Sequence, residues 1–333
     1  MRKLVNESGD IEFGYAKIDT VNYLDFDLRN SMDKPLPKWR KKFKFNQFQF
    51  ISISCDTFIL GLAIVDLKYA SNCFVYLYNI QEKSYDEFEF TQALSLNTRM
   101  SSQPNSGLSR FKKGNTLVEI LAKNNQRFIT LKLGNGNRIK AYISEPKEQN
   151  PLCVCSRAGY NDWVYTQKNT TLKIEGEINW QGKVFNLAKL NALASVDWSA
   201  GFMRRETSWN WANLSTQLAD GRKLGFNFAS GINETGVSEN AIWLEGELIK
   251  VDLIHFKFDR YRQEESWLIQ SSDKRISLSF HPKGKRDKKL NLYFIASNFR
   301  QFFGYFDGTL QVKNETIRLN QTWGLIEDHY AKW

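Results

Sequence analysis

Hydrophobic and polar residues alternate with a period of two along most of the chain. Residues 48–54 and 275–280 are examples of this alternation. This period is typical of β-strands with one buried side. Glycine-containing turn signals separate the strands, among them Gln181-Gly182, Asp220-Gly221 and Asp307-Gly308. Helical periodicity is weak, and only residues 186–195 suggest a short helix, although a strand fits them too. We therefore predict an all-β protein with less than about 15% helix.

The chain contains two similar halves, in which five short motifs recur in the same order. The matched segments are 48–54 with 209–215, 60–63 with 224–227, 72–77 with 240–244, 127–131 with 275–278, and 176–187 with 308–319. Each match is weak alone, but five in one order indicate an internal duplication. The halves also end alike, near Asp197 and Glu327. We predict tandem lipocalin- or calycin-like antiparallel β-barrels, with residues 1–45 as an N-terminal arm, 46–201 as the first barrel and 202–333 as the second.

Composition agrees with a globular protein of this size. The 333 residues are 42% hydrophobic with only 6 proline residues, which excludes a disordered or collagen-like chain. No run of about 18 apolar residues predicts a membrane span, and the first residues do not resemble a signal peptide. Four cysteines form no disulfide framework, so we expect a reducing compartment, the cytoplasm.

The net charge of +10 comes mainly from two basic clusters, at residues 34–44 and 283–289. In the first cluster, aromatic residues alternate with lysine and arginine, which predicts an edge strand with its charges in solvent. The second cluster contains Pro282 and Gly284 and predicts a polar hairpin loop. The alternative is a patch for nucleic acid or an anionic membrane, and the pattern favours solvated surfaces, with at most weak contact to anionic surfaces.

Five motifs stand out: Tyr165-Thr166-Gln167-Lys168, residues 197–201, residues 207–212, residues 239–243 and the C-terminal segment 324–333. Together they resemble a bacterial family, the domain-of-unknown-function 2804 family. The resemblance begins near Lys38 and is more specific in the second half. That family is distantly similar to tandem-lipocalin proteins that include carotenoid 1,2-hydratase and some pericyclic cyclases. The resemblance implies a twin-barrel fold. It implies no particular activity, because no reaction is established for that family.

The strongest local pattern for a binding site lies at residues 205–211. In a strand, Arg205, Thr207, Trp209 and Trp211 project from one face. A guanidinium, a hydroxyl and two indoles suit an apolar cavity with a few directed polar groups. We predict that Trp209 and Trp211 line the cavity of the second barrel. The alternative is that both indoles are ordinary core and that Arg205 is paired at the rim.

Glu327 and His329 share a face of the last strand. A carboxylate beside an imidazole can act as an acid–base pair, with Glu327 as the general acid or base and His329 setting its protonation. The alternative is that this carboxylate only holds the C-terminal strand in place by hydrogen bonds.

Further acidic groups lie next to aromatic residues, at Asp197 and at Glu239-Asn240 ahead of Trp243. An acid there could protonate an alkene or assist dehydration, with indole faces stabilising the cation. Asn240 and Trp243 would then help to bind the substrate. Turn formation is the alternative, because Asp and Asn are common at strand ends.

Motifs for metals, phosphates and dinucleotides are absent from the sequence, so we expect no cofactor and no metal. Cys153 and Cys155 share a strand face without further ligands and predict buried thiols. The sequence thus leaves three classes open. The protein is a cofactor-free hydratase-, isomerase- or cyclase-like enzyme, a carrier of an apolar or amphipathic small molecule, or an interaction protein that uses its basic arm.

Overall fold

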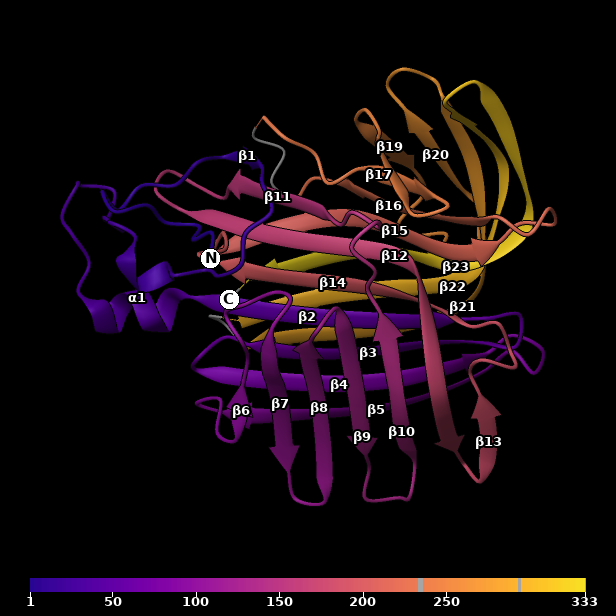
Figure 1. The fold of residues 1–333 in the computed structure, drawn as a ribbon, viewed down its shortest axis with the longest axis horizontal. Coiled ribbons are helices and arrows are strands. Elements are labelled where there is room, and N and C mark those ends of the chain that lie inside the picture. Colours follow the sequence, from indigo (N-terminus) through magenta and orange to yellow (C-terminus); the bar gives the residue numbers. More distant parts are fainter. Residues whose placement is uncertain (233–235, 293–294, 333) are drawn as a thin grey trace.

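The computed structural model describes residues 1–232, 236–292 and 295–332. Strands account for 62% of the chain and helices for 3%, which confirms the all-β prediction. Two curled antiparallel sheets form the body of the molecule, one from each half of the chain (Figure 1). The described residues include no helix that is long and apolar enough to cross a membrane.

The first sheet contains 14 strands in the described residues and runs in the order β5-β4-β3-β2-β14-β12-β10-β9-β8-β7-β6. Its main strands are β2 (Asn46–Ser54), β3 (Phe58–Asp66), β4 (Ala70–Asn79), β5 (Ser84–Ala93), β6 (Thr98–Arg99), β7 (Gly107–Lys113), β8 (Thr116–Lys123), β9 (Gln126–Lys132), β10 (Arg138–Ser144), β12 (Trp163–Trp180) and β14 (Leu193–Gly201). Three further strands belong to this sheet but lie outside that order: β1 (Gly14–Tyr15), which pairs with β11 (Leu152–Arg157), and β11 and β13 (Lys183–Asn186), which both pair with β12.

The second sheet contains nine strands in the described residues and runs in the order β18-β17-β16-β15-β23-β22-β21-β20-β19. Its strands are β15 (Glu206–Gln217), β16 (Lys223–Ser230), β17 (Ala241–Leu244), β18 (Glu247–Lys250), β19 (Ile254–Lys257), β20 (Trp267–Ser271), β21 (Ile276–Leu292), β22 (Ile295–Val312) and β23 (Glu315–Lys332).

The two strand orders coincide when β2 is matched with β15 and β14 with β23. Strands β3, β4, β12 and β10 then correspond to β16, β17, β22 and β21. Four of the five sequence matches fall on corresponding strands. The match of residues 127–131 with 275–278 is wrong by one strand, because β9 corresponds to β20 and residues 276–278 begin β21. Short alternating segments look alike, so sequence alone could not separate neighbouring strands.

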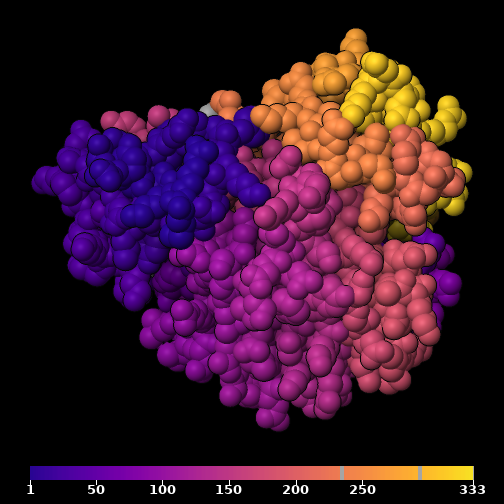
Figure 2. Space-filling model, viewed as in Figure 1, coloured from indigo at the N-terminus to yellow at the C-terminus, as the bar shows by residue number. Residues whose placement is uncertain are grey.

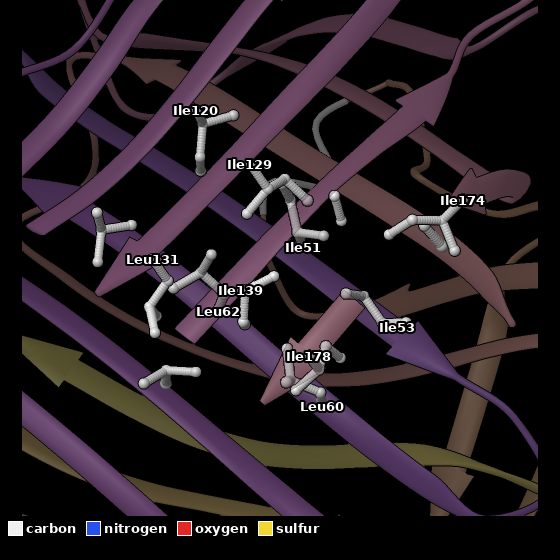
Figure 3. Close-up of a cluster of buried hydrophobic side chains, with 14 of the residues drawn as sticks. Ile51, Ile53, Leu60, Leu62, Ile120, Ile129, Leu131, Ile139, Ile174 and Ile178 are labelled. Carbon is white, nitrogen blue, oxygen red and sulfur yellow. The ribbon is translucent and has the colours of Figure 1, made fainter. Parts of the chain in front are cut away.

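Each sheet curls around its own apolar core. In the first sheet, side chains of β2 to β4 such as Ile51 and Leu62 meet side chains of β9 and β10 such as Ile129 and Ile139 (Figure 3). In the second sheet, Phe226, Phe280 and other apolar residues fill the equivalent space. The concave faces therefore supply the hydrophobic stabilisation of each half.

The outer faces of the two sheets pack against each other. The residues of this inter-sheet layer include Phe50, Phe74, Tyr76, Tyr78, Trp211, Phe303 and Leu325, with Trp209 at its border. Near the centre of the layer, corresponding residues touch: the Ser52 hydroxyl donates to Asn213 Oδ1 at 3.3 Å, and the Ser54 hydroxyl donates to the Ser215 carbonyl at 3.0 Å. Contacts between corresponding residues indicate a pseudo-twofold relation between the halves.

The N-terminal residues cover one end of the first sheet. Leu28 and Phe45 pack there against Trp163 and Phe202. A 3₁₀ turn, η1 (Tyr23–Asp25), and one helix, α1 (Lys38–Lys44), lie in this segment. The predicted edge strand in residues 34–44 is therefore wrong. Pro37 is the N-cap of α1, where its missing N–H leaves no helical hydrogen bond unmade, and lysine and arginine favour the helical conformation.

Three other local predictions are also wrong. Residues 283–289 lie inside the long strand β21, and a bulge between Pro282 and Gly284 accommodates the two residues that suggested a loop. Residues 186–195 form no helix, because β13 ends at Asn186 and β14 begins at Leu193. Asp307-Gly308 lies within β22, at a shift of its register with β23 rather than in a hairpin.

Gly176 and Gly308 occupy corresponding places in β12 and β22, and their φ angles are +124° and +129°. A Cβ atom on either residue would lie 2.3 Å from a backbone oxygen, that of Lys140 or Ser277. We expect Gly176→Ala and Gly308→Ala each to lower the free energy of unfolding by about 2 kcal/mol or more, from overpacking and backbone strain. Urea denaturation followed by tryptophan fluorescence measures this loss.

Gly136→Ala is the matched control. Its φ is +93°, but no atom lies within 4 Å of the added Cβ, so only the backbone strain of about 1 kcal/mol remains. Equal losses in all three variants would contradict the close-approach argument.

Candidate functional site

Trp209 and Trp211 share a face of β15, and that face meets the first sheet. Trp211 packs in the inter-sheet layer with Phe50, at a ring distance of 6.0 Å. The opposite face of β15, with Ala212 and Leu214, covers the core of the second sheet. The prediction that Trp209 and Trp211 line the interior of the second barrel is therefore wrong. Alternation defines two faces of a strand but does not say which of them meets the curled side of the sheet.

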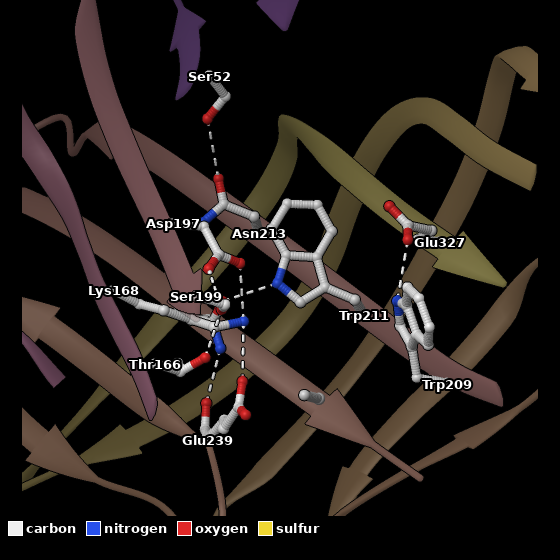
Figure 4. A network of polar contacts seen from close by, with 12 residues as sticks. Ser52, Thr166, Lys168, Asp197, Ser199, Trp209, Trp211, Asn213, Glu239 and Glu327 are labelled. Carbon is white, nitrogen blue, oxygen red and sulfur yellow. Dashed lines mark hydrogen bonds and ion pairs between the residues drawn. The ribbon is translucent and has the colours of Figure 1, made fainter. Parts of the chain in front are cut away.

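One group of polar residues in this layer centres on Lys168 of β12. Its Nζ lies 2.9 Å from Asp197 Oδ2 of β14 and 3.0 Å from Glu239 Oε2, which precedes β17 (Figure 4). All three side chains are largely buried. Ser199 donates a further hydrogen bond to Asp197 Oδ1 at 3.3 Å. Lys168 therefore joins the two halves of the chain through a buried ion pair.

A small cavity adjoins Lys168 between the sheets. Its volume is about 10 Å³, close to the minimum that holds one water molecule. Asp197, Trp211, Asn227 and Trp243 are among its lining residues. The indole of Trp211 donates to Asn227 Oδ1 at 2.7 Å, and the Asn227 amide donates to the Glu239 carbonyl at 2.6 Å. The cavity is too small for an organic substrate.

The electrostatics of Lys168 indicate a structural ion pair. Burial alone would lower its pKa, but attraction by Asp197 and Glu239 outweighs burial and raises the pKa above 10.5. The amine therefore stays protonated at neutral pH and does not act as a nucleophile. Asp197 and Glu239, both predicted as catalytic residues, are held by this cation. Their predicted catalytic role gains no support from this arrangement.

Asn240 and Trp243 make contacts that hold strands together. The Asn240 Oδ1 atom accepts from the Ala229 backbone at 2.7 Å, and the Trp243 indole donates to the Asn150 carbonyl at 2.9 Å. Both side chains are fully buried. Arg205 is exposed just before β15, and Thr207 is half-buried opposite Ala331. The structure therefore does not bring these four residues together around one cavity.

A second polar group centres on Glu327 of β23. The Trp209 indole donates to Glu327 Oε1 at 2.9 Å (Figure 4). The Gln301 amide of β22 donates to Glu327 Oε2 at 3.2 Å. His329 Nδ1 lies 3.7 Å from Oε1, and its Nε2 lies 3.0 Å from the Ser297 hydroxyl. The His329 ring also packs on Trp209, with centroids 4.3 Å apart. Three of the predicted site residues, Trp209, Glu327 and His329, are thus in mutual contact.

Glu327 and Asp197 occupy the same position in the two halves. Asp197 pairs with Phe50 on one side and Lys168 on the other. Glu327 pairs with Trp211, which corresponds to Phe50, and with Gln301. Gln301 therefore stands where the first half has Lys168. One copy of this position holds a carboxylate with a cation, and the other holds a carboxylate with a neutral amide.

Glu327 differs from the adjacent carboxylate, Asp328, whose charge is compensated by arginine residues. Asp328, the next residue, lies within 2.9 Å of Arg260 and 2.8 Å of Arg300. In the described part of the chain, neither lysine nor arginine forms an ion pair with Glu327, although this residue is only 8% exposed. A buried carboxylate without a cation costs free energy. Such local costs are typical of functional sites.

Two unpartnered polar atoms lie in the same region as Glu327. The Tyr76 hydroxyl and His329 Nδ1 are buried without a hydrogen-bond partner among the described residues. Burial raises the pKa of Tyr76, with Arg286 opposing and Glu327 adding to the shift, so the phenol keeps its proton at neutral pH. The Arg286 guanidinium lies between the rings of Phe74 and Phe299. A carboxylate and an imidazole thus lie in contact, and a protonated phenol lies in the same inter-sheet layer.

The side chains in the described ranges form no cluster of three or more histidine, cysteine, aspartate or glutamate residues placed to hold a metal ion. Cys153 and Cys155 lie beneath the N-terminal segment. Burial raises the pKa of Cys153 to about 11 and that of Cys155 to about 12, so both remain thiols at neutral pH.

Sequence reasoning did not identify Lys168, Gln301 or Tyr76. One signal for Lys168 was present, because it is the single charged residue in the segment 163–172. Gln301 and Tyr76 carried no such signal. Their proximity to Glu327 depends on strand pairing and on the packing of one sheet against the other.

The fold and these sites define a tandem protein of two lipocalin-like antiparallel sheets joined back to back. The chain belongs to the family described as domain of unknown function (DUF2804), whose model matches residues 1–333. This confirms the predicted family. No curated protein matches the chain by sequence.

Solved structures resemble the chain in fold. Kievitone hydratase from Nectria haematococca shares 13% identity at a TM-score of 0.51, over 86% of this chain and 89% of its own. CghA shares 8% identity at a TM-score of 0.52, over 98% and 96%. A putative AttH from Nitrosomonas europaea shares 11% identity at a TM-score of 0.48, over 87% and 92%. The TM-scores of kievitone hydratase and CghA show a similar fold, and identities this low leave the activity open.

Replacing Lys168 by Met tests the structural role of the ion pair. Because the folded state raises the Lys168 pKa, the pair stabilises the protein fully below about pH 10.5 and loses its effect as the pH rises further. We expect Lys168→Met to lower the free energy of unfolding at about pH 8 by about 3–5 kcal/mol.

Lys189→Met, in an exposed turn, provides the control and should change stability by less than about 0.5 kcal/mol. Urea denaturation across pH measures both variants. A Lys168→Met variant as stable as the wild type would disprove the structural role.

Proposed function

We propose that the protein is a cofactor-free acid–base catalyst that acts on an apolar or amphipathic small molecule, with Glu327 as the general acid or base. One observation carries the proposal. Among the described residues, the buried Glu327 carboxylate accepts hydrogen bonds from the neutral donors Trp209 and Gln301 and pairs with His329 but with no lysine or arginine, while the corresponding Asp197 is bound to a lysine.

The surroundings of Glu327 suit proton transfer. His329 Nδ1 faces Glu327 Oε1 at 3.7 Å, and Ser297 fixes the other ring nitrogen. A proton can move between a carboxylate and a substrate atom when the two come within hydrogen-bond distance. The Tyr76 phenol keeps its proton and lies in the same inter-sheet layer, without a hydrogen-bond partner among the described residues.

The apolar walls favour an apolar or amphipathic substrate. Trp209 and Phe299 both pack on the His329 ring, and all three are partly exposed. The site is thus reached from the border of the inter-sheet layer, where Ser297 and Thr207 are also half-buried. Hydration, the reaction named for kievitone hydratase, is acid–base chemistry, so the shared fold agrees with this proposal.

Glu327→Gln keeps the size of the side chain and removes its titratable proton. We expect the variant to fold and to lose turnover by about 100-fold or more. Wild type and variant are each incubated with a small-molecule extract of the cells that make the protein. Mass spectrometry then detects compounds that gain or lose one water, or that isomerise to a species with a new retention time.

Glu315→Gln, at an exposed position of the same strand, is the control and should convert the same compounds as the wild type. Circular dichroism checks that each variant is folded. Undiminished conversion by Glu327→Gln would refute a catalytic role. A compound that the wild type binds but does not convert would instead favour a role as a small-molecule carrier.

Gln301→Lys recreates at Glu327 the arrangement seen at Asp197. We expect the new lysine to pair with Glu327 and to reduce conversion by about 100-fold or more, while the folded state tolerates the balanced charge. If Glu327 has only a structural role, the new lysine should raise the free energy of unfolding and leave conversion unchanged.

Gln311→Lys, exposed on the same strand β22, controls for added charge. The conversion assay and urea denaturation of the same samples separate the catalytic effect from the structural one.

A further inference from the structure

Helix α1 presents two aromatic side chains to solvent. Trp39 is 60% exposed and Phe43 is 50% exposed. Residues four positions apart lie on one face of a helix, so Trp39 and Phe43 project from the same side of α1. Met32, seven residues before Trp39 in the chain, is 73% exposed. Large apolar side chains grouped in this way are uncommon on a protein surface without a binding role.

Two lysines fix the direction in which this aromatic face points. Lys41 donates to the Phe26 carbonyl, and Lys44 pairs with Asp162 at 2.6 Å. Both contacts lie on the side of α1 opposite Trp39 and Phe43. The helix stands at one end of the molecule, in the lobe formed by the N-terminal residues (Figures 1 and 2). The aromatic face is therefore held outward by the fold.

Basic residues flank the aromatic face. Lys38, Arg40 and Lys42 are exposed on α1, and Arg40 lies 5.1 Å from the centre of the Trp39 ring. Residues 34–44 contain six basic residues and no acidic one. The surface thus combines positive charge with protruding apolar groups.

We propose that α1 is an anchor that docks on an anionic lipid surface, with Trp39 and Phe43 inserted at the level of the headgroups. Tryptophan favours this interface, and each nearby lysine or arginine gains from anionic headgroups. A nucleic acid would instead require a groove that follows its backbone, whereas α1 is a protruding helix. This proposal does not depend on the catalytic role of Glu327.

Sedimentation with vesicles tests the anchor. The full chain is mixed with vesicles of phosphatidylcholine alone, or of phosphatidylcholine with about 30% phosphatidylglycerol. We expect binding to the anionic vesicles to be at least about tenfold tighter and to weaken strongly at about 0.5 M salt. The double variant Trp39→Ser/Phe43→Ser should lose at least about tenfold in affinity, and Lys38→Gln/Lys42→Gln should lose a similar factor.

Tyr261→Ser removes another aromatic residue, one that is 90% exposed, and should bind as the wild type does. Circular dichroism confirms that the variants keep their fold. Absence of binding to anionic vesicles, or binding that both double variants retain, would overturn the proposal. The proposal would also be overturned if a labelled oligonucleotide bound the protein more tightly than the vesicles do and both double variants weakened that binding.

Discussion

The packing of the two sheets against each other, outer face to outer face, is the constraint on which the rest of the structure depends. Phe50 of one half meets Trp211 of the other at the corresponding position. This contact removes water from the region between the sheets. Charged side chains enclosed there must find a partner within the protein or remain uncompensated at a cost.

The duplication shows both solutions at one position. In the first half, Asp197 is neutralised by Lys168, and Glu239 joins from the second half. In the second half, Glu327 receives hydrogen bonds from Trp209 and Gln301. In this pseudo-symmetric protein, one copy of the position therefore holds a neutralised carboxylate, and the other holds a carboxylate without a lysine or arginine partner among the described residues. This difference would not be apparent in a chain with a single sheet.

The N-terminal segment adds a feature that the duplication does not explain, because it has no counterpart in the second half. Its apolar residues, such as Phe45, cover Trp163 at the end of the first sheet. Its basic helix lies on the outside, with Trp39 and Phe43 exposed. The buried part of this segment stabilises the first sheet, while its outer part provides a separate surface, remote from the curled cores.

The sequence by itself determined the strand pattern, the order of the repeats and the residues that share a strand face. Period-two alternation is a local property, so Trp209 with Trp211 and Glu327 with His329 could be grouped correctly. Only the tertiary structure decided that the Trp209 face meets the first sheet, that Lys168 reaches Glu239 and that Gln301 lies beside Glu327. These contacts join residues distant in the chain, and alternation carries no information about which surface covers a given face.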